Sequence, residues 1–316
     1  YTVTNFPAAA GTKKTGRKAG KLMREEKTGK ENRRGSMDGQ TAGQLAEQTA
    51  WLLSELKRKR PLVHCITNYV TANDCANILL AIGASPIMAD DPEETEEIAA
   101  AASALVLNMG TPSRRKLEGM VRAGKKANEK GIPVILDPVG AGASRLRQEM
   151  TERLIREVRV DILRGNVSEI SFAAGLASCE KGVDVSEADR GIDRTEAALA
   201  AARRLGCTVA VTGEADVVTD GKHMARIRGG SAMMARVTGT GCMTSALAGA
   251  FAGAAGDSGE VFSAAVAALA AMGIAGETAF EKAGHLGCGS FHMALLDAVG
   301  GLSEKSIRER ADIEEG

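Results

Sequence analysis

A glycine-rich turn carrying one potential nucleophile opens the segment Val237–Phe251. Gly239 and Gly241 can adopt backbone angles that other residues avoid, which leaves successive N–H groups unpaired. The small residues that follow predict a helix, whose first N–H groups and positive dipole end would point to the same place. Such a turn can bind a phosphate group during transfer or an oxyanion, although similar turns also begin helices that only pack against a neighbour. Cys242 lies where the positive helix end would lower the pKa of a thiol.

Carboxylates and other polar side chains follow several apolar runs, at the points where parallel strands would end. Asp137 closes one such run and Glu169 follows the next. Two carboxylates on neighbouring strand ends could hold one Mg²⁺, with phosphate oxygens and water as its other ligands. Arg164 could bind nucleotide phosphates, and Thr212 could line the nucleotide. As alternatives, Asp137 could form a turn, Glu169 could cap a helix and Arg164 could form a surface ion pair.

A second polar group lies nearer the amino terminus, around the start of a helix predicted over 71–82. Asn68 and Thr71 could face a ligand there, or could simply cap that helix. Met88 ends a strand predicted over 84–88, and its adaptable thioether suits contact with a sulfur-containing or aromatic ring. A Met at a strand end is more often part of the core.

Several function classes are excluded or disfavoured by the sequence. No G-x-x-x-x-G-K-[ST] motif occurs, and the glycine turn lacks the spacing of a dinucleotide fingerprint. The formal net charge of +0 and the aromatic content of 3 % argue against nucleic acid and membrane surfaces as partners. No apolar run reaches the roughly 18 residues that a membrane span needs. The six cysteines include no C-x-x-C pair, which predicts reduced thiols in a cytoplasmic protein, and His64 is expected in the core.

Predicted strands alternate with predicted helices from residue 41 onward. Apolar, β-branched runs predict strands over 62–67, 84–88, 104–107, 133–137, 162–164, 209–212 and 217–219. Helical periodicity predicts helices over 41–59, 71–82, 113–130, 144–158, 196–205, 240–254, 260–282 and 287–299. The alternation predicts a three-layer α/β fold, in which helices cover both faces of a central, mostly parallel sheet. Ligands of such sheets bind beyond the carboxyl ends of the strands.

The first 36 residues differ in composition from the rest of the chain. Residues 1–36 are rich in Lys, Arg, Gly and Thr and have almost no apolar periodicity, so they cannot bury enough surface to offset their ordering entropy. We interpret them as a disordered basic tail, from upstream read-through or left over from cloning, with Met37 as the natural start. A targeting or RNA-binding arm is the alternative. Residues 37–316 are expected to form a single domain.

Six segments carry a family pattern: 61–89 (PLVHCITNYVTANDCANILLAIGASPIMA), 107–111 (LNMGT), 135–143 (ILDPVGAGA), 163–166 (LRGN), 211–214 (VTGE) and 238–242 (TGTGC). Together they resemble the hydroxyethylthiazole kinase family of the ribokinase-like superfamily, over essentially everything after residue 40. The resemblance implies a ribokinase-like fold and ATP-dependent phosphorylation of the hydroxyl of 4-methyl-5-(2-hydroxyethyl)thiazole in thiamine salvage. It also implies a homotrimer with the thiazole site at a subunit interface.

The resemblance also implies roles for individual residues. The thiazole would be contacted by Met88 and Gly239, with Asn68 near its ring. ATP would be bound by Arg164 and Thr212, and Mg²⁺ by Asp137 and Glu169. Cys242 stands where most kinases of the superfamily carry an Asp base, so it is expected to be catalytic, as a weak base or as a group that orients the hydroxyl.

Three other functions are compatible with parts of this pattern. A hydroxymethylpyrimidine (phosphate) kinase has a similar Gly–Cys turn but usually opens with A-G-x-D-x-S-G-G-A-G, where this chain has I-T-N-Y. A sensor that binds thiazole or nucleotide without turnover would not need Asp137, Glu169 and the glycine turn together. A lyase or dehydratase on the same fold is the third possibility.

Overall fold

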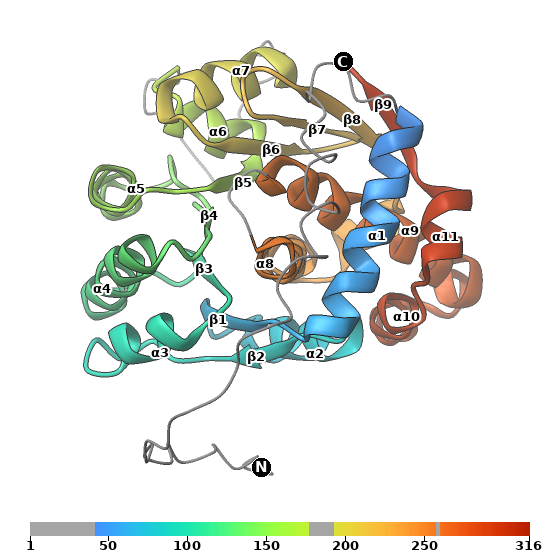
Figure 1. Ribbon diagram of the computed structural model, residues 1–316, viewed down its shortest axis with the longest axis horizontal. Helices are drawn as coiled ribbons and strands as arrows, with labels where there is room; N and C mark the ends of the chain where they lie inside the picture. The colour runs from blue at the N-terminus through green and yellow to red at the C-terminus, as the bar shows by residue number, and fades with distance from the viewer. Residues whose placement is uncertain (1–41, 177–192, 257–259) are drawn as a thin grey trace, which may run out of the picture. The chain divides into compact units, whose positions relative to one another are not determined.

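The computed structural model describes residues 42–176, 193–256 and 260–316. The predicted tail, residues 1–36, and the start at Met37 lie outside these residues and stay predictions. In the described part of the chain, nine strands form one sheet in the order β2-β1-β3-β4-β5-β6-β7-β8-β9 (Figure 1). The strands are β1 (Leu62–Ile66), β2 (Ser85–Ile87), β3 (Ala104–Asn108), β4 (Val134–Asp137), β5 (Ile162–Asn166), β6 (Thr208–Thr212), β7 (Ala215–Thr219), β8 (Met224–Arg228) and β9 (Asp312–Glu315).

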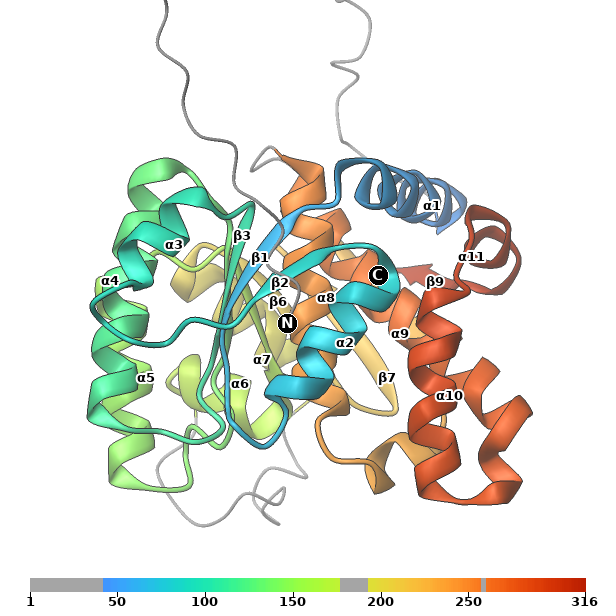
Figure 2. The same ribbon diagram turned by 90° about the horizontal axis from the view of Figure 1, so that it is seen from below.

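The first six strands pair in parallel, and β7, β8 and β9 extend the sheet in antiparallel fashion. Helices cover both faces (Figures 1 and 2). One face carries α3 (Thr95–Ala101), α4 (Arg114–Lys130), α5 (Arg145–Glu157), α6 (Val167–Ala173) and α7 (Arg194–Leu205). The other carries α1 (Ala42–Lys59), α2 (Ala72–Ile82), α8 (Thr240–Ala255), α9 (Val261–Ala283), α10 (Cys288–Gly300) and α11 (Glu304–Arg310), with the short 3₁₀ helices η2 (Ala232–Arg236) and η4 (Gly284–Leu286). The predicted three-layer α/β fold is therefore confirmed.

The long predicted elements agree with the structure to within a few residues, whereas several short ones were missed. The sequence reasoning did not predict α3, α6, α11, β8 and β9. Each missed helix contains seven residues, about two turns, which repeat the apolar period too few times to be recognised. The strands β8 (MARIR) and β9 (DIEE) carry charged residues between their apolar ones and so lack the apolar run by which the other strands were predicted.

Side-chain caps fix where the helices begin at the carboxyl edge of the sheet. Ser113 accepts a hydrogen bond from the backbone N–H of Lys116 and starts α4, soon after β3 ends. Ser144 does the same for α5 after β4, through the N–H of Arg147. Such caps satisfy N–H groups that a helix leaves unpaired, so the chain turns sharply from strand to helix at this edge.

The helix α9 corrects the expectation that no apolar run is long enough to cross a membrane. In the ranges that the structure describes, Val261–Leu286 is the one stretch that passes this test of length and composition. Its most apolar window is 83 % buried inside the protein, where α9 packs against α1, α8 and α10. The apolar composition of α9 therefore reflects its place in the core.

Gly249 allows α8 to lie very close to the sheet. A Cβ at this position would lie 2.5 Å from Val106 Cγ2 and 3.1 Å from Val63 Cγ1. Both valines belong to strands near the middle of the parallel region and are stiff at χ1. The contact sets the depth of α8 against β1 and β3, and with it the position of the amino-terminal turn of α8.

We predict that Gly249→Ala destabilises the protein. Overpacking typically costs about 1–3 kcal/mol, and the 2.5 Å approach to Val106 places Gly249 in the upper part of that range, above the roughly 1 kcal/mol by which Ala favours a helix over Gly. The free energy of unfolding, measured by urea titration, is expected to fall by about 1–2 kcal/mol. Gly43→Ala in α1 is the control, because a Cβ there meets nothing within 4 Å. A Gly249→Ala protein as stable as the parent would contradict this account of the packing.

Candidate active site

Polar side chains from the ends of neighbouring strands meet the first turn of α8. Asn68 follows β1, Asn108 ends β3 and Asp137 ends β4. Asn68 Nδ2 and Asn108 Nδ2 each donate a hydrogen bond to Cys242 Sγ over 3.3 Å. The carboxyl edge of the parallel sheet thus joins side chains that are up to 174 positions apart in the chain.

The two glycines of the turn serve different purposes. Gly239 has a φ of 86°, and a Cβ there would lie 2.7 Å from Thr71 Cγ2, so both its backbone angle and its packing require glycine. Gly241 lies inside the first turn of α8, so the predicted special backbone angle is wrong for this residue. A Cβ on Gly241 would lie 2.8 Å from Arg164 Nη1, so this glycine leaves room for the guanidinium. Among the described residues no side chain caps α8, which leaves its first N–H groups available to an anion.

Cys242 is a partly buried thiol whose pKa is shifted opposite to the prediction. Burial, and after it the carboxylate of Asp137, raises the pKa of the Cys242 thiol above its ordinary value. Hydrogen bonds with three neighbouring side chains oppose this shift, namely those with Thr71, Asn68 and Asn108. The predicted lowering by the helix end is therefore wrong, because desolvation of the thiolate is the larger effect. At neutral pH the thiol of the free protein is protonated.

Asp137 is a fully buried carboxylate with one oxygen paired and one unpaired. Its Oδ2 accepts hydrogen bonds from Ser245 Oγ at 2.7 Å and from Asn108 Nδ2 at 2.8 Å, and lies 3.7 Å from Arg164 Nη1. Its Oδ1 is buried and has no hydrogen-bond partner among the described residues. Burial raises the pKa of Asp137, and the charge of Arg164 opposes that rise. A buried, unpaired carboxylate oxygen is a favourable ligand for a hard cation.

Glu169 combines a structural role with a place beside Asp137. It forms a capping box with Asn166 at the start of α6, so the capping alternative from the sequence is confirmed. Its Oε2 accepts from Asn166 N and its Oε1 from Gly140 N, each at 2.8 Å. Burial raises the pKa of Glu169, and the charge of Asp137 raises it further, so the two carboxylates interact electrostatically. Each Glu169 oxygen keeps a lone pair for a water molecule or a metal ion.

Arg164 and Thr212 lie together on β5 and β6. Arg164 Nη2 donates to Thr212 Oγ1 at 2.9 Å, and Thr212 Oγ1 donates to the carbonyl of Gly165 at 3.2 Å. The side chain of Arg164 is only 13 % exposed, which contradicts the alternative of a surface ion pair. Its guanidinium therefore lies between the first turn of α8 and the end of the sheet, close to the carboxylate of Asp137.

The four residues discussed around the first two strands occupy distinct positions. Asn68 is almost fully buried, and its Oδ1 accepts from the backbone N–H of Thr71 at 3.1 Å. Thr71 is the N-cap residue of α2 but makes no side-chain capping bond within the described residues. Met88 follows β2 and is 37 % exposed, so it is not the core residue that a strand-end Met more often is. His64 is fully buried as expected, with Nε2 2.7 Å from the carbonyl of Ala89.

Four polar residues that tie the site together were not singled out from the sequence. Asn108 and Ser245 both hydrogen-bond Asp137 Oδ2. Arg147 Nη1 and Nη2 donate to three carbonyls in the loops after β3 and β4, and Lys116 Nζ donates to the carbonyl of Thr67 at 2.9 Å. The sequence offered a signal for two of them, since Asn108 directly follows the strand predicted over 104–107 and Ser245 lies one helical turn after Cys242.

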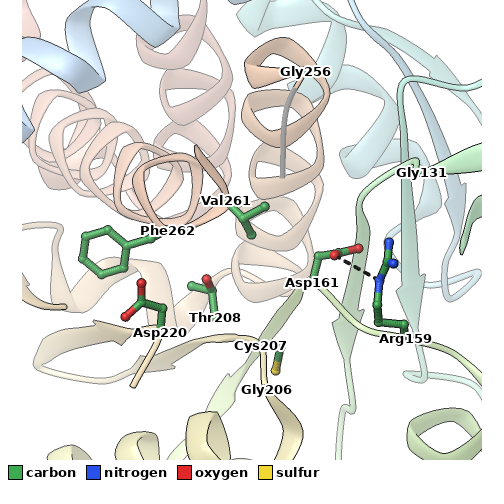
Figure 3. A pocket seen from close by; sticks show the side chains of 10 residues that line it. All are labelled: Gly131, Arg159, Asp161, Gly206, Cys207, Thr208, Asp220, Gly256, Val261 and Phe262. Atoms are coloured by element: carbon green, nitrogen blue, oxygen red, sulfur yellow. Dashed lines mark ion pairs between the residues drawn. The ribbon is translucent and has the colours of Figure 1, made fainter. Parts of the chain in front are cut away.

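A cavity of about 580 Å³ lies at the other end of the sheet and contains none of these residues (Figure 3). It is lined where β5 and β6 begin and where α4, α7 and α8 end. Its most buried carboxylate, Asp161, accepts a hydrogen bond from Val134 N and lies 3.6 Å from Arg159 Nε. The Asp161 carboxylate thus has partners at this end of the sheet, and none of the predicted site residues lines this cavity.

Comparisons with known proteins identify the family of this chain. The sequence pattern of the Hydroxyethylthiazole kinase family matches residues 53–305. A hydroxyethylthiazole kinase of Ruminiclostridium cellulolyticum is 54 % identical over 273 residues, which cover 86 % of this chain and 99 % of that protein. A second, from Clostridium beijerinckii, is 53 % identical over 84 % of this chain and 96 % of its own length.

Solved structures of two kinases resemble the fold of this chain. The hydroxyethylthiazole kinase protein of Pyrococcus horikoshii superposes with a TM-score of 0.76 at 40 % identity, covering 85 % of this chain and 98 % of that one. A pyridoxal kinase of Staphylococcus aureus reaches a TM-score of 0.50 at 16 % identity, over 69 % of this chain and 87 % of its own, which reflects the shared ribokinase-like fold alone. With the family pattern matched over most of its length, this chain belongs to the hydroxyethylthiazole kinase family.

Proposed function

We propose that the protein transfers the terminal phosphoryl group of ATP to the hydroxyl of 4-methyl-5-(2-hydroxyethyl)thiazole, giving the thiazole phosphate for thiamine salvage. Its family membership supports this activity. The observation that carries it is the meeting of Asn68, Asp137 and Cys242 at the uncapped amino terminus of α8. There a helix end can bind the transferred phosphate beside a group that can orient the attacking hydroxyl.

Cys242 is the residue proposed to act at the reacting hydroxyl. Phosphoryl transfer through a loose transition state depends mainly on positioning and charge stabilisation, so a strong base is not required. The Cys242 sulfur, held by two amide donors, can accept or orient the hydroxyl proton as the hydroxyl attacks phosphorus. That proton would pass to the sulfur only when the thiol has been deprotonated, because a thiol itself is a poor acceptor.

Mg²⁺ is the proposed metal, and the residues present fit it. Asp137 Oδ1 has no partner among the described residues, and Glu169 retains lone pairs for a water ligand or the ion itself. A bound Mg²⁺ would neutralise charge on the phosphate oxygens. Arg164 and Thr212 are proposed to bind the nucleotide. The guanidinium of Arg164 already lies under the first turn of α8, where phosphates would bind.

The thiazole is proposed to lie near Asn68 and Gly239, with Met88 against its ring. We further propose that the protein is a cytoplasmic homotrimer with the thiazole site at a subunit interface. Large apolar side chains are exposed around α2 and α10, which pack against each other: Tyr69, Val70, Leu80, Met88 and Met293. A second copy on this surface would remove them from water and close the site beside Met88.

The proposed reaction predicts ADP release that depends on the thiazole alcohol. In a coupled assay with Mg–ATP, the purified protein is expected to turn over hydroxyethylthiazole faster than hydroxymethylpyrimidine. Omission of the alcohol gives the background rate. Preference for the pyrimidine would identify the rival kinase, and saturable thiazole binding without ADP release would identify a sensor.

Replacing the thiol is expected to lower turnover far more than nucleotide affinity. Because general-base assistance contributes about 10²–10⁴-fold, Cys242→Ser should reduce kcat by at least ~100-fold while the KM for ATP changes little. The raised pKa of Cys242 predicts a second measurable effect, on the pH dependence of kcat/KM. Only the thiolate accepts a proton, so kcat/KM of the parent should increase as the pH rises toward that pKa, and this increase should be absent in Cys242→Ser. A serine variant with parental kcat would reduce Cys242 to a packing role.

Removing the charge of Asp137 is expected to disturb the metal requirement. Asp137→Asn keeps the shape of the side chain but loses the anionic ligand, so more Mg²⁺ should be needed and kcat should fall by about 100-fold or more. Asp161→Asn, at the opposite end of the sheet, serves as the control with an unchanged Mg²⁺ titration. An Asp137→Asn enzyme with the parental titration and rate would exclude this role.

A further inference from the structure

The carboxamide of Asn108 uses its whole hydrogen-bonding capacity inside the site. Its Oδ1 accepts from Asn68 Nδ2 and from Gly110 N, each at 2.9 Å. Its Nδ2 donates to Asp137 Oδ2 at 2.8 Å and to Cys242 Sγ at 3.3 Å. A carboxamide has two N–H donors and one oxygen with two lone pairs, so all four positions are filled. The side chain is 1 % exposed, which leaves water little access to these bonds.

The surroundings of Asn108 permit only one orientation of its amide. If the amide were turned over, its oxygen would face the Asp137 carboxylate and its NH₂ group would face the N–H of Gly110. Both contacts would be repulsive, and buried polar groups that lose their partners are costly. The sheet imposes the same arrangement, because Asn108 and Asp137 are paired in register at the ends of β3 and β4 and therefore project to one face.

We infer that Asn108 is a positioning residue for the transfer step: its carboxamide holds the Cys242 sulfur and the Asp137 carboxylate in one fixed arrangement. This inference rests on the proposed roles of Cys242 and Asp137. By occupying Asp137 Oδ2, the amide leaves Oδ1 as the oxygen available to a cation. By donating to the sulfur together with Asn68, it holds the thiol beside Asp137 at the first turn of α8. No other common side chain of this size supplies two donors and two lone pairs at once.

The test is the isosteric substitution Asn108→Asp. It retains an oxygen acceptor for Asn68 and Gly110 but replaces the NH₂ donor with a second oxygen, which faces both Asp137 and the sulfur. Groups that orient reacting residues typically contribute about 10–100-fold to activity, so kcat should fall by that factor. The KM values for ATP and thiazole should change by no more than about threefold, because Asn108 is not proposed to bind either.

Asn128 offers a matched control. Its amide also bridges two groups, since Nδ2 donates to the carbonyl of Arg159 at 2.9 Å and Oδ1 accepts from Arg159 N at 2.7 Å. This bridge lies at the opposite end of the sheet, beside the start of β5. Asn128→Asp applies the same chemical change and is expected to leave kcat within about twofold of the parent.

A double-mutant cycle separates positioning from a purely structural effect. If Asn108 acts through the sulfur, the loss in kcat caused by Asn108→Asp should be at least ~3-fold smaller in a Cys242→Ala background than in the parent. Losses that multiply independently would overturn the inference, as would parental kcat in Asn108→Asp or a change confined to KM. Parental kcat in Cys242→Ala alone would instead overturn the proposed role of the thiol.

Stability is checked by thermal melting of each variant. If Asn108→Asp fails to fold, Asn108→Ser replaces it, because a hydroxyl keeps one donor and introduces no charge. Its kcat is then expected to fall about tenfold with unchanged KM values, and a parental kcat in the serine variant would overturn the inference.

Discussion

The buried carboxylate of Asp137 is the constraint on which the site depends. A charged group removed from water is strongly destabilised unless nearby groups compensate, and full burial raises the pKa of this carboxyl accordingly. The compensation comes from three separate elements: Asn108 on β3, Arg164 on β5 and Ser245 on α8. Each of these must hold its position for the carboxylate to remain charged, so the chemistry of the site and the packing of three elements are coupled.

The compensating groups meet because α8 packs closely against the sheet. Its many small residues, and Gly249 above all, let the helix backbone approach β1 and β3. This approach places the uncapped first turn of α8 against the ends of the strands, and Gly241 leaves the space that Arg164 occupies. A helix with larger side chains would be held away from the sheet, and its first N–H groups would not reach the same point.

The same constraint explains why a thiol is suited to position 242. Cys242 is partly buried beside Asp137, and both burial and that neighbouring charge raise its pKa. A thiol that stays neutral at neutral pH adds no second negative charge to the buried site, so it avoids most of the repulsion between like charges. The donated hydrogen bonds from Asn68 and Asn108 nevertheless keep the sulfur oriented for the moment at which the proton is lost.

The sequence by itself determined the long helices and strands, the α/β class and the positions of Asp137, Glu169 and Cys242 at the carboxyl edge. These follow from local periodicity and from the rule that parallel strands end together. Only the tertiary structure decided the burial, the pKa and the hydrogen-bond partners of each residue at that edge. The pKa of Cys242 is raised because desolvation depends on what packs around the thiol. Asn108 became central because strand register, which no local pattern encodes, sets it beside Asp137.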